Sequence, residues 1–147
     1  LVSPETAPDE DLFELANFAF RGGHYERAAE LYERWFAAPE LTRDADLLNR
    51  AAWQLYLARK SLGTGVAMAR QAYAENATAD VADTLARLLY VSGEPDEALA
   101  VQNEAVRKAN GPRAEQFADV VRRMELGLEL DDRPAFETFP GPREIAL

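Results

Sequence analysis

The sequence predicts an all-α fold of about seven helices that pack as antiparallel pairs. Residues 10–128 are rich in Ala, Leu, Glu and Arg, which are good helix formers. No segment alternates apolar and polar residues with a period of two, so no strand is expected. Gly and Pro interrupt this body at regular intervals, and the short connections that result force neighbouring helices to run antiparallel.

Residues that start or stop helices bound each expected element. Three carboxylates at 9–11 lie where a helix dipole favours negative charge. Ser61 is the expected N-cap of the fourth helix, and Pro95 suits the first turn of the sixth. Gly22, Pro39 and Gly93 follow expected helix ends. The expected helices span about residues 10–21, 25–38, 45–60, 62–75, 79–91, 95–109 and 113–128.

Two segments flank this helical body. Residues 1–9 contain two prolines and little apolar surface, and they predict an N-terminal coil. The tail, 129–147, contains three prolines, so no helix is expected there. Its apolar residues indicate that it docks on the body, and whether it lies in a groove of the body stays open; these residues are Phe136, Phe139 and Ile145.

Composition excludes several classes of function. The chain has 147 residues, enough for one domain that buries roughly 68–70% of the surface of its unfolded chain. Its formal net charge is −10, so it lacks the basic stripe of a nucleic-acid-binding protein, and it would repel anionic lipid. No apolar run is long enough to insert into a membrane. Of the 16 basic residues, Lys60 and Lys108 are Lys and the rest are Arg.

No residue pattern predicts catalysis. The chain has no Cys, and His24, its one His, lies at an expected turn without an identifiable partner to orient it. A zinc site would need mostly carboxylates, and the spacing of a calcium loop is absent. We therefore expect no enzyme activity, no cofactor and no metal. An enzyme that uses carboxylates in a groove is the least supported hypothesis.

Three segments repeat one pattern. They begin at residues 14, 50 and 84, and these starts are 36 and 34 residues apart. Each segment has Ala at its third position and an aromatic residue at its end. The second helices also match, because Ala28 and Ala98 lie 70 residues apart with Gly65 between them, where a small residue is needed. The matched residues are Ala16, Ala52 and Ala86, and Phe20, Tyr56 and Tyr90.

A period near 34 built from helix pairs is typical of a helical array, in which each pair covers the open apolar face of its neighbour. The pattern resembles the tetratricopeptide repeat (TPR) family, with copies at about 10–43, 44–78 and 79–112 and a capping helix at 113–128. The first copy departs from the family at Trp35, and the second has a longer link and two glycines. The resemblance implies a right-handed superhelix, an α-solenoid. A plain helical bundle is the alternative.

The resemblance also implies a binding surface. In the family, the first helix of each pair forms a concave face that holds segments of partner proteins. Aromatic and Arg residues are frequent binding anchors, and Trp53 is the best candidate for an exposed one. Packing is the alternative role for Phe13, and the expected main role for Phe20, Tyr56 and Tyr90. The candidate partner-binding residues are Phe13, Asn17, Arg21, Asn49, Trp53, Tyr56, Asp80, Asp83, Arg87 and Tyr90.

The charges on this face suggest the kind of partner. Family members that clamp a C-terminal carboxylate use Lys, Asn, Asn, Lys and Arg, and of these only Asn17 matches here. Asp80 and Asp83 would repel a carboxylate, so a protein or peptide segment of basic and apolar character is expected. The sequence therefore predicts a scaffold or adaptor without catalysis. The alternative is a homodimer through the 113–128 helix, by its apolar residues Phe117, Val120, Val121 and Met124.

Overall fold

The chain forms seven α-helices in a computed structural model that describes residues 7–39, 41 and 43–130. A short 3-10 helix, η1 (Asp9–Asp11), precedes them, and the described residues contain no strand. The all-α fold with seven helices is thus confirmed. The helices are α1 (Leu12–Arg21), α2 (Tyr25–Ala37), α3 (Ala45–Ala58), α4 (Leu62–Glu75), α5 (Ala79–Val91), α6 (Pro95–Lys108) and α7 (Gly111–Glu125).

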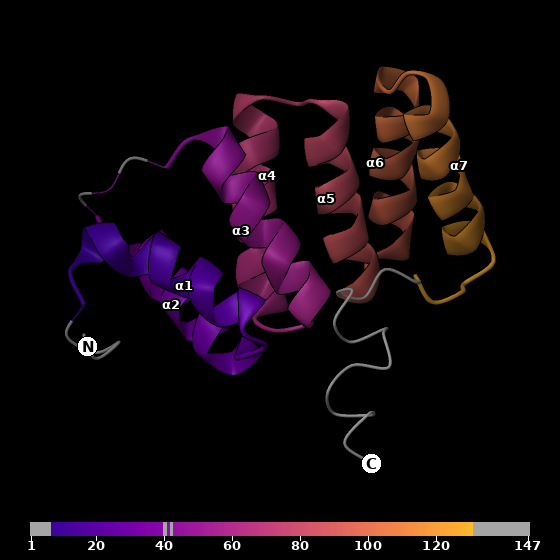
Figure 1. Cartoon of the computed structure of the whole chain (residues 1–147). Helices are drawn as coiled ribbons and strands as arrows, with labels where there is room; N and C mark the ends of the chain where they lie inside the picture. Colours follow the sequence, from indigo (N-terminus) through magenta and orange to yellow (C-terminus); the bar gives the residue numbers. More distant parts are fainter. Residues whose placement is uncertain (1–6, 40, 42, 131–147) are drawn as a thin grey trace, which may run out of the picture.

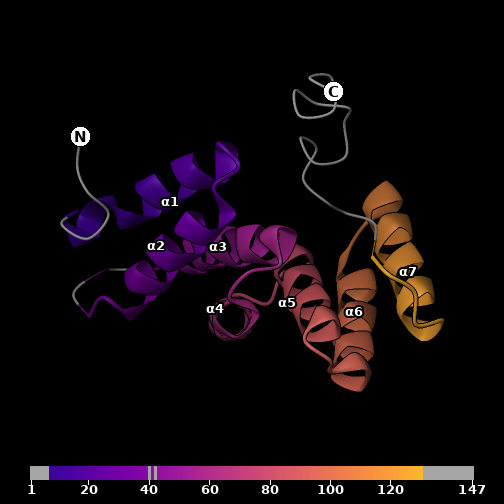
Figure 2. The same ribbon diagram turned by 90° about the horizontal axis from the view of Figure 1, so that it is seen from below.

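The helices pack in chain order, each antiparallel to the one before (Figure 1). The closest partners are α1 with α2, α3 with α4, and α5 with α6, and α7 packs on α6. Helix α5 also contacts both α3 and α4, which joins the second pair to the third. Seen from below, the row of helices bends so that α1, α3, α5 and α7 border its inner side, and α2 and α4 lie outside (Figure 2).

The helix ends differ from the prediction where turns take special backbone conformations. Ser61 does not cap α4 through its side chain, because its backbone is left-handed (φ 49°), as is that of Arg59 (φ 55°). Side-chain N-caps occur instead at Asp44, which accepts from the amide of Leu47, and at Thr78. Helix α7 begins at Gly111, two residues before the predicted start, and ends at Glu125.

Small residues sit where the helices cross. The three repeated alanines, Ala16, Ala52 and Ala86, have no exposed surface, and Ala98 has none either. Large side chains fill the space between the crossings, and one main cluster of buried residues runs from α1 to α7. This arrangement is what the repeat predicted, since close backbone approach requires small side chains and the remaining volume requires large ones.

Side chains hold the first helix pair to the second, because the backbones of α2 and α3 meet at few points. The hydroxyl of Tyr32 hydrogen-bonds to the side-chain amides of Asn17 and Gln54, and so links α1, α2 and α3. Arg43 donates to the backbone oxygen of Trp35 at 3.1 Å. Burial raises the pKa of the Tyr32 hydroxyl above its ordinary value, because the charged form would be poorly solvated there.

The last described residues fold back onto the body. The Tyr90 hydroxyl donates to the backbone oxygen of Leu128 at 2.7 Å, and Leu130 is buried in the main cluster. Residues 127–130 thus contact the helical body, and of these only 129 and 130 belong to the predicted tail. Its remaining part, with Phe136, Phe139 and Ile145, lies outside the described residues, as do residues 1–6 of the N-terminal segment.

Two glycines of α4 allow a direct test of how closely α4 packs against its neighbours α3 and α5. A Cβ at Gly65 would lie 2.9 Å from Cδ2 of Leu88, which is fully buried, and 3.5 Å from Cβ of Leu55. A Cβ at Gly63 would meet nothing within 4 Å. We expect Gly63→Ala to raise the free energy of unfolding by up to about 0.5–1 kcal/mol, because Gly is a poor helix former. Gly65→Ala should lower it by roughly 1–2 kcal/mol, because the added methyl overpacks the crossing.

Urea unfolding followed by circular dichroism measures both variants against the unmodified chain. Equal stabilisation by the two substitutions would show that α4 and α5 do not approach as closely at Gly65 as the structure places them.

Candidate functional site

A pocket of about 200 Å³ opens on the inner side of the array, where α3, α5 and α7 meet. The side chains come together because residues three or four apart share one face of a helix. Helix α3 supplies two sequence-predicted residues, Asn49 and Trp53, and α5 supplies Asp80 and Asp83. The complete lining is Asn49, Arg50, Trp53, Asp80, Asp83, Thr84 and Arg113.

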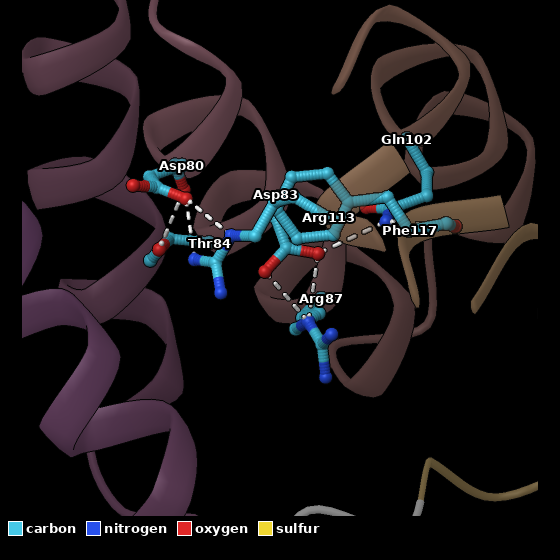
Figure 3. Close-up of polar contacts among 7 residues, drawn as sticks. All are labelled: Asp80, Asp83, Thr84, Arg87, Gln102, Arg113 and Phe117. Carbon is cyan, nitrogen blue, oxygen red and sulfur yellow. Dashed lines mark hydrogen bonds and ion pairs between the residues drawn. The ribbon is translucent and has the colours of Figure 1, made fainter. Parts of the chain in front are cut away.

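Asp83 is buried in a hydrogen-bonded network at the back of this pocket (Figure 3). Nε of Arg87 lies 2.9 Å from both of its carboxylate oxygens, and Nε2 of Gln102 donates to Oδ1 at 2.9 Å. The same Gln102 nitrogen donates to the backbone oxygen of Phe117 at 3.3 Å, which links the network to α7. Burial raises the pKa of Asp83, and the positive charge of Arg87 opposes that shift.

Asp80 is paired at the mouth of the pocket. Nε of Arg113 lies 3.1 Å from Oδ1 of Asp80, and both side chains are more than half exposed. Figure 3 shows the two residues reaching toward each other from α5 and α7. An exposed pair of this kind contributes little to stability, about 0–1 kcal/mol. It does, however, set the charge that an incoming group meets.

These pairs remove the reason for expecting a basic partner. That expectation treated Asp80 and Asp83 as uncompensated negative charges on the concave face. Each is in an ion pair with an arginine of the same chain, Arg113 and Arg87 respectively. The lining also contains Arg50, which forms no ion pair with any described residue. The pocket is therefore not the acidic site that the sequence suggested.

Arginine side chains lie over aromatic rings throughout this region. The guanidinium carbon of Arg87 is 5.4 Å from the ring centre of Trp53, and that of Arg113 is 4.9 Å from Phe117. Arg50 lies 5.5 Å from the ring centre of Phe13. A guanidinium in such a position is attracted by the ring and held in a defined place. The aromatic residues of the inner side thus position cations as well as fill the core.

The ten candidate residues fall into three groups. Arg21 and Asp80 are exposed, and four are partly buried, of which Asn49 and Trp53 line the pocket. Buried in the interior are Phe13, Asn17, Tyr56 and Asp83. The burial of Tyr56 agrees with the packing expected as its main role, and that of Phe13 with the alternative given for it. Asn17 and Asp83, which were expected on the open face, are instead covered by neighbouring helices. The other two partly buried residues do not line the pocket: Arg87 is bound to Asp83, and Tyr90 to the backbone of Leu128.

Asn49 carries an unused acceptor. Its Oδ1 is enclosed and has no hydrogen-bond partner among the described residues. An unpaired buried oxygen of this kind costs about 1–3 kcal/mol. A donor that reached the pocket, with a small rotation of the side chain, would remove that cost. The side chain is thus one of the groups that a ligand could engage.

Sequence reasoning missed two arginines of the pocket, Arg50 and Arg113. The signal for Arg50 was present, because it opens the second repeated segment at 50 as Thr84 opens the third at 84, and both residues line the pocket. Nothing in the sequence indicated that Arg113, in the first turn of α7, would reach back to Asp80. Its position depends on how far α7 rotates about α6.

A second hollow, of about 570 Å³, lies at the other end of α3 and α5. Residues 127–130 form one wall of it, and Tyr90 and Leu57 lie opposite. Tyr90 binds the backbone of Leu128 here, so its observed role is to hold a segment of its own chain.

Comparisons with protein-family models, with curated proteins and with solved structures found no match to this chain. Within the described ranges, no three His, Asp or Glu side chains are grouped so that they could hold a metal ion. None of the helices in those ranges combines the length and the apolar surface that crossing a membrane would require.

The buried carboxyl gives a pH prediction. The pKa of Asp83 is raised above its ordinary 3.8, so the folded chain binds this proton more tightly than the unfolded chain. Protonation as the pH falls toward 3.8 therefore favours the folded state through this group. Between about pH 7 and about pH 4, the unmodified chain should lose less stability than Asp83→Asn.

Glu97→Gln is the opposite case, since Arg70 lowers the pKa of Glu97. The ion pair of Glu97 with Arg70 contributes to stability only while Glu97 is charged, and acidification removes that charge. The unmodified chain should therefore lose more stability than Glu97→Gln over the same pH range. Urea unfolding at both pH values measures the two differences. The same sign for both variants would contradict the assigned environments.

Proposed function

We propose that this chain is a TPR-like interaction module that binds a segment of another protein on the inner side of its helical array. The observation that carries the proposal is the position of Trp53. This large aromatic is partly exposed in a pocket built by three helices, whereas the other tryptophan, Trp35, is only 3% exposed. Partly exposed aromatic residues in pockets are frequent anchors of protein interfaces.

The assignment to a TPR-like family rests on two features together. The repeated Ala and aromatic positions recur every 34 to 36 residues, and the helices pack pairwise in chain order. Arrays of this kind leave a continuous surface along one side, which suits recognition of an extended or helical segment. The module would act as a scaffold or adaptor, with no chemical step.

Self-association through α7 has less support. Phe117, Val120 and Met124 are buried, and Phe117 packs with Ala82 and Ala105. The apolar face that would have formed a dimer interface is therefore used within the chain. The exposed side of α7 is polar, with residues such as Glu115, Asp119 and Arg122.

Site-specific photo-crosslinking tests the proposal. A photoreactive amino acid replaces Asp46 on the inner side of α3, or, as controls, Ala67 or Gln71 on the exposed side of α4. We expect position 46 to capture one discrete protein from a lysate of the source cells, and the outer positions to capture none. Trp53→Ala should reduce that capture roughly tenfold or more, as expected for loss of a binding anchor of about 2 kcal/mol.

Circular dichroism of Trp53→Ala must first show that the helices are intact. Equal capture from both sides, or capture that Trp53→Ala leaves unchanged, would contradict binding on the inner side.

A further inference from the structure

We propose that the pocket between α3, α5 and α7 receives a carboxylate side chain of the bound segment, held by Arg50 and Arg113 beside Trp53. The inference rests on the proposed function and specifies the chemistry of the partner at one site. The partner segment would thus be acidic at this position, the reverse of what the sequence suggested.

The balance of charge around the pocket supports an anion. Asp83 is matched by Arg87, and Asp80 is matched by Arg113. The positive charge of Arg50 is left without an ion pair among the described residues. Asp46 lies four residues before Arg50 on α3, but no ion pair joins the two in the described structure. Complementary charge across an interface steers association and selects the partner.

A cation would meet a less favourable site. To bind Asp80 it would have to displace Arg113, and to bind Asp83 it would have to enter the interior and displace Arg87. A carboxylate displaces neither pair. It can approach Arg113 from the solvent side, because a guanidinium has five N–H donors and Asp80 is bound by Nε and Nη2.

The two arginines are prepared for this contact. Arg50 lies over the ring of Phe13 and Arg113 over that of Phe117, so both guanidinium groups are held in place before a ligand arrives. The N–H groups of a guanidinium can bond a carboxylate in a planar, two-pronged geometry. Because the two arginine side chains are already ordered, they lose less conformational entropy when a ligand binds.

The size of the pocket matches one side chain. At about 200 Å³ it admits an Asp or Glu side chain, and the partly exposed ring of Trp53 offers apolar contact to the neighbouring residue. An acidic residue next to an aromatic one is therefore the simplest sequence that this site would select.

Three short peptides on the intact protein test the inference. The probes are acetyl-Gly-Glu-Phe-Glu-Gly-amide and its counterparts with Gln or Lys in place of both Glu. Each is titrated into the ¹⁵N-labelled full chain, and the indole N–H signals of Trp53 and Trp35 are followed. Trp35 is buried and serves as the internal control.

We expect the Glu peptide to shift the Trp53 signal and leave that of Trp35 in place. Its affinity should exceed that of the Gln peptide by roughly fivefold at low salt, and the difference should shrink as salt is added. Arg50→Gln should weaken binding of the Glu peptide by about five- to tenfold. Arg107→Gln, which removes another exposed arginine from α6, should have no effect.

Stronger binding of the Lys peptide, equal binding of the Glu and Gln peptides, or no shift of the Trp53 signal would overturn the inference. It can fail separately from the proposed function. If a crosslinker at position 46 captures a partner and Arg50→Gln in the same chain leaves that capture unchanged, the interaction surface stands and the carboxylate site does not. If no partner is captured at position 46, the surface itself is wrong.

Discussion

Each helix pair in this chain has more apolar surface than the pair can bury by itself. The next pair must cover the face that is left, and the helices can approach closely only where small residues lie at the crossings. Ala16, Ala52, Ala86 and Ala98 occupy such positions and are fully enclosed, and Gly65 allows Leu88 to come within contact of the α4 backbone. The order of the helices, and hence the surface they leave open, follows from this requirement.

The same stacking produces the pocket. Because α3 and α5 lie side by side, residues on the exposed faces of both helices converge, and α7 closes the mouth with Arg113. The enclosed carboxylate of Asp83 finds its partners within the chain, in Arg87 and Gln102. The outer part of the face, with Trp53, Arg50 and Arg113, is where we propose that a partner binds. The proposed binding residues therefore lie beside the enclosed polar groups but are different side chains.

The sequence predicted the helices and the small residues at their crossings, because both follow from local propensity and from a repeat that is visible in one chain. It did not predict which polar residues of the inner face would be enclosed. Asn17 is buried by Tyr32 of the next helix, and Asp83 by Gln102 of the helix after its own. Such contacts depend on rotation between helices, which residue spacing does not specify. The left-handed turn through Arg59 and Ser61 was missed because non-glycine residues rarely adopt it.

The central claim is that the chain is a serial array in which each pair depends on its neighbours. Native-state hydrogen exchange of the full chain, in increasing sub-denaturing urea, tests it most directly. Since α2 and α3 meet at few points and α5 packs closely with α6, amides of α1 and α2 should exchange through a partial opening of lower free energy than those of α5 and α6. If every helix exchanges only through one common global unfolding, the chain behaves as a single cooperative globule, and the serial account is contradicted.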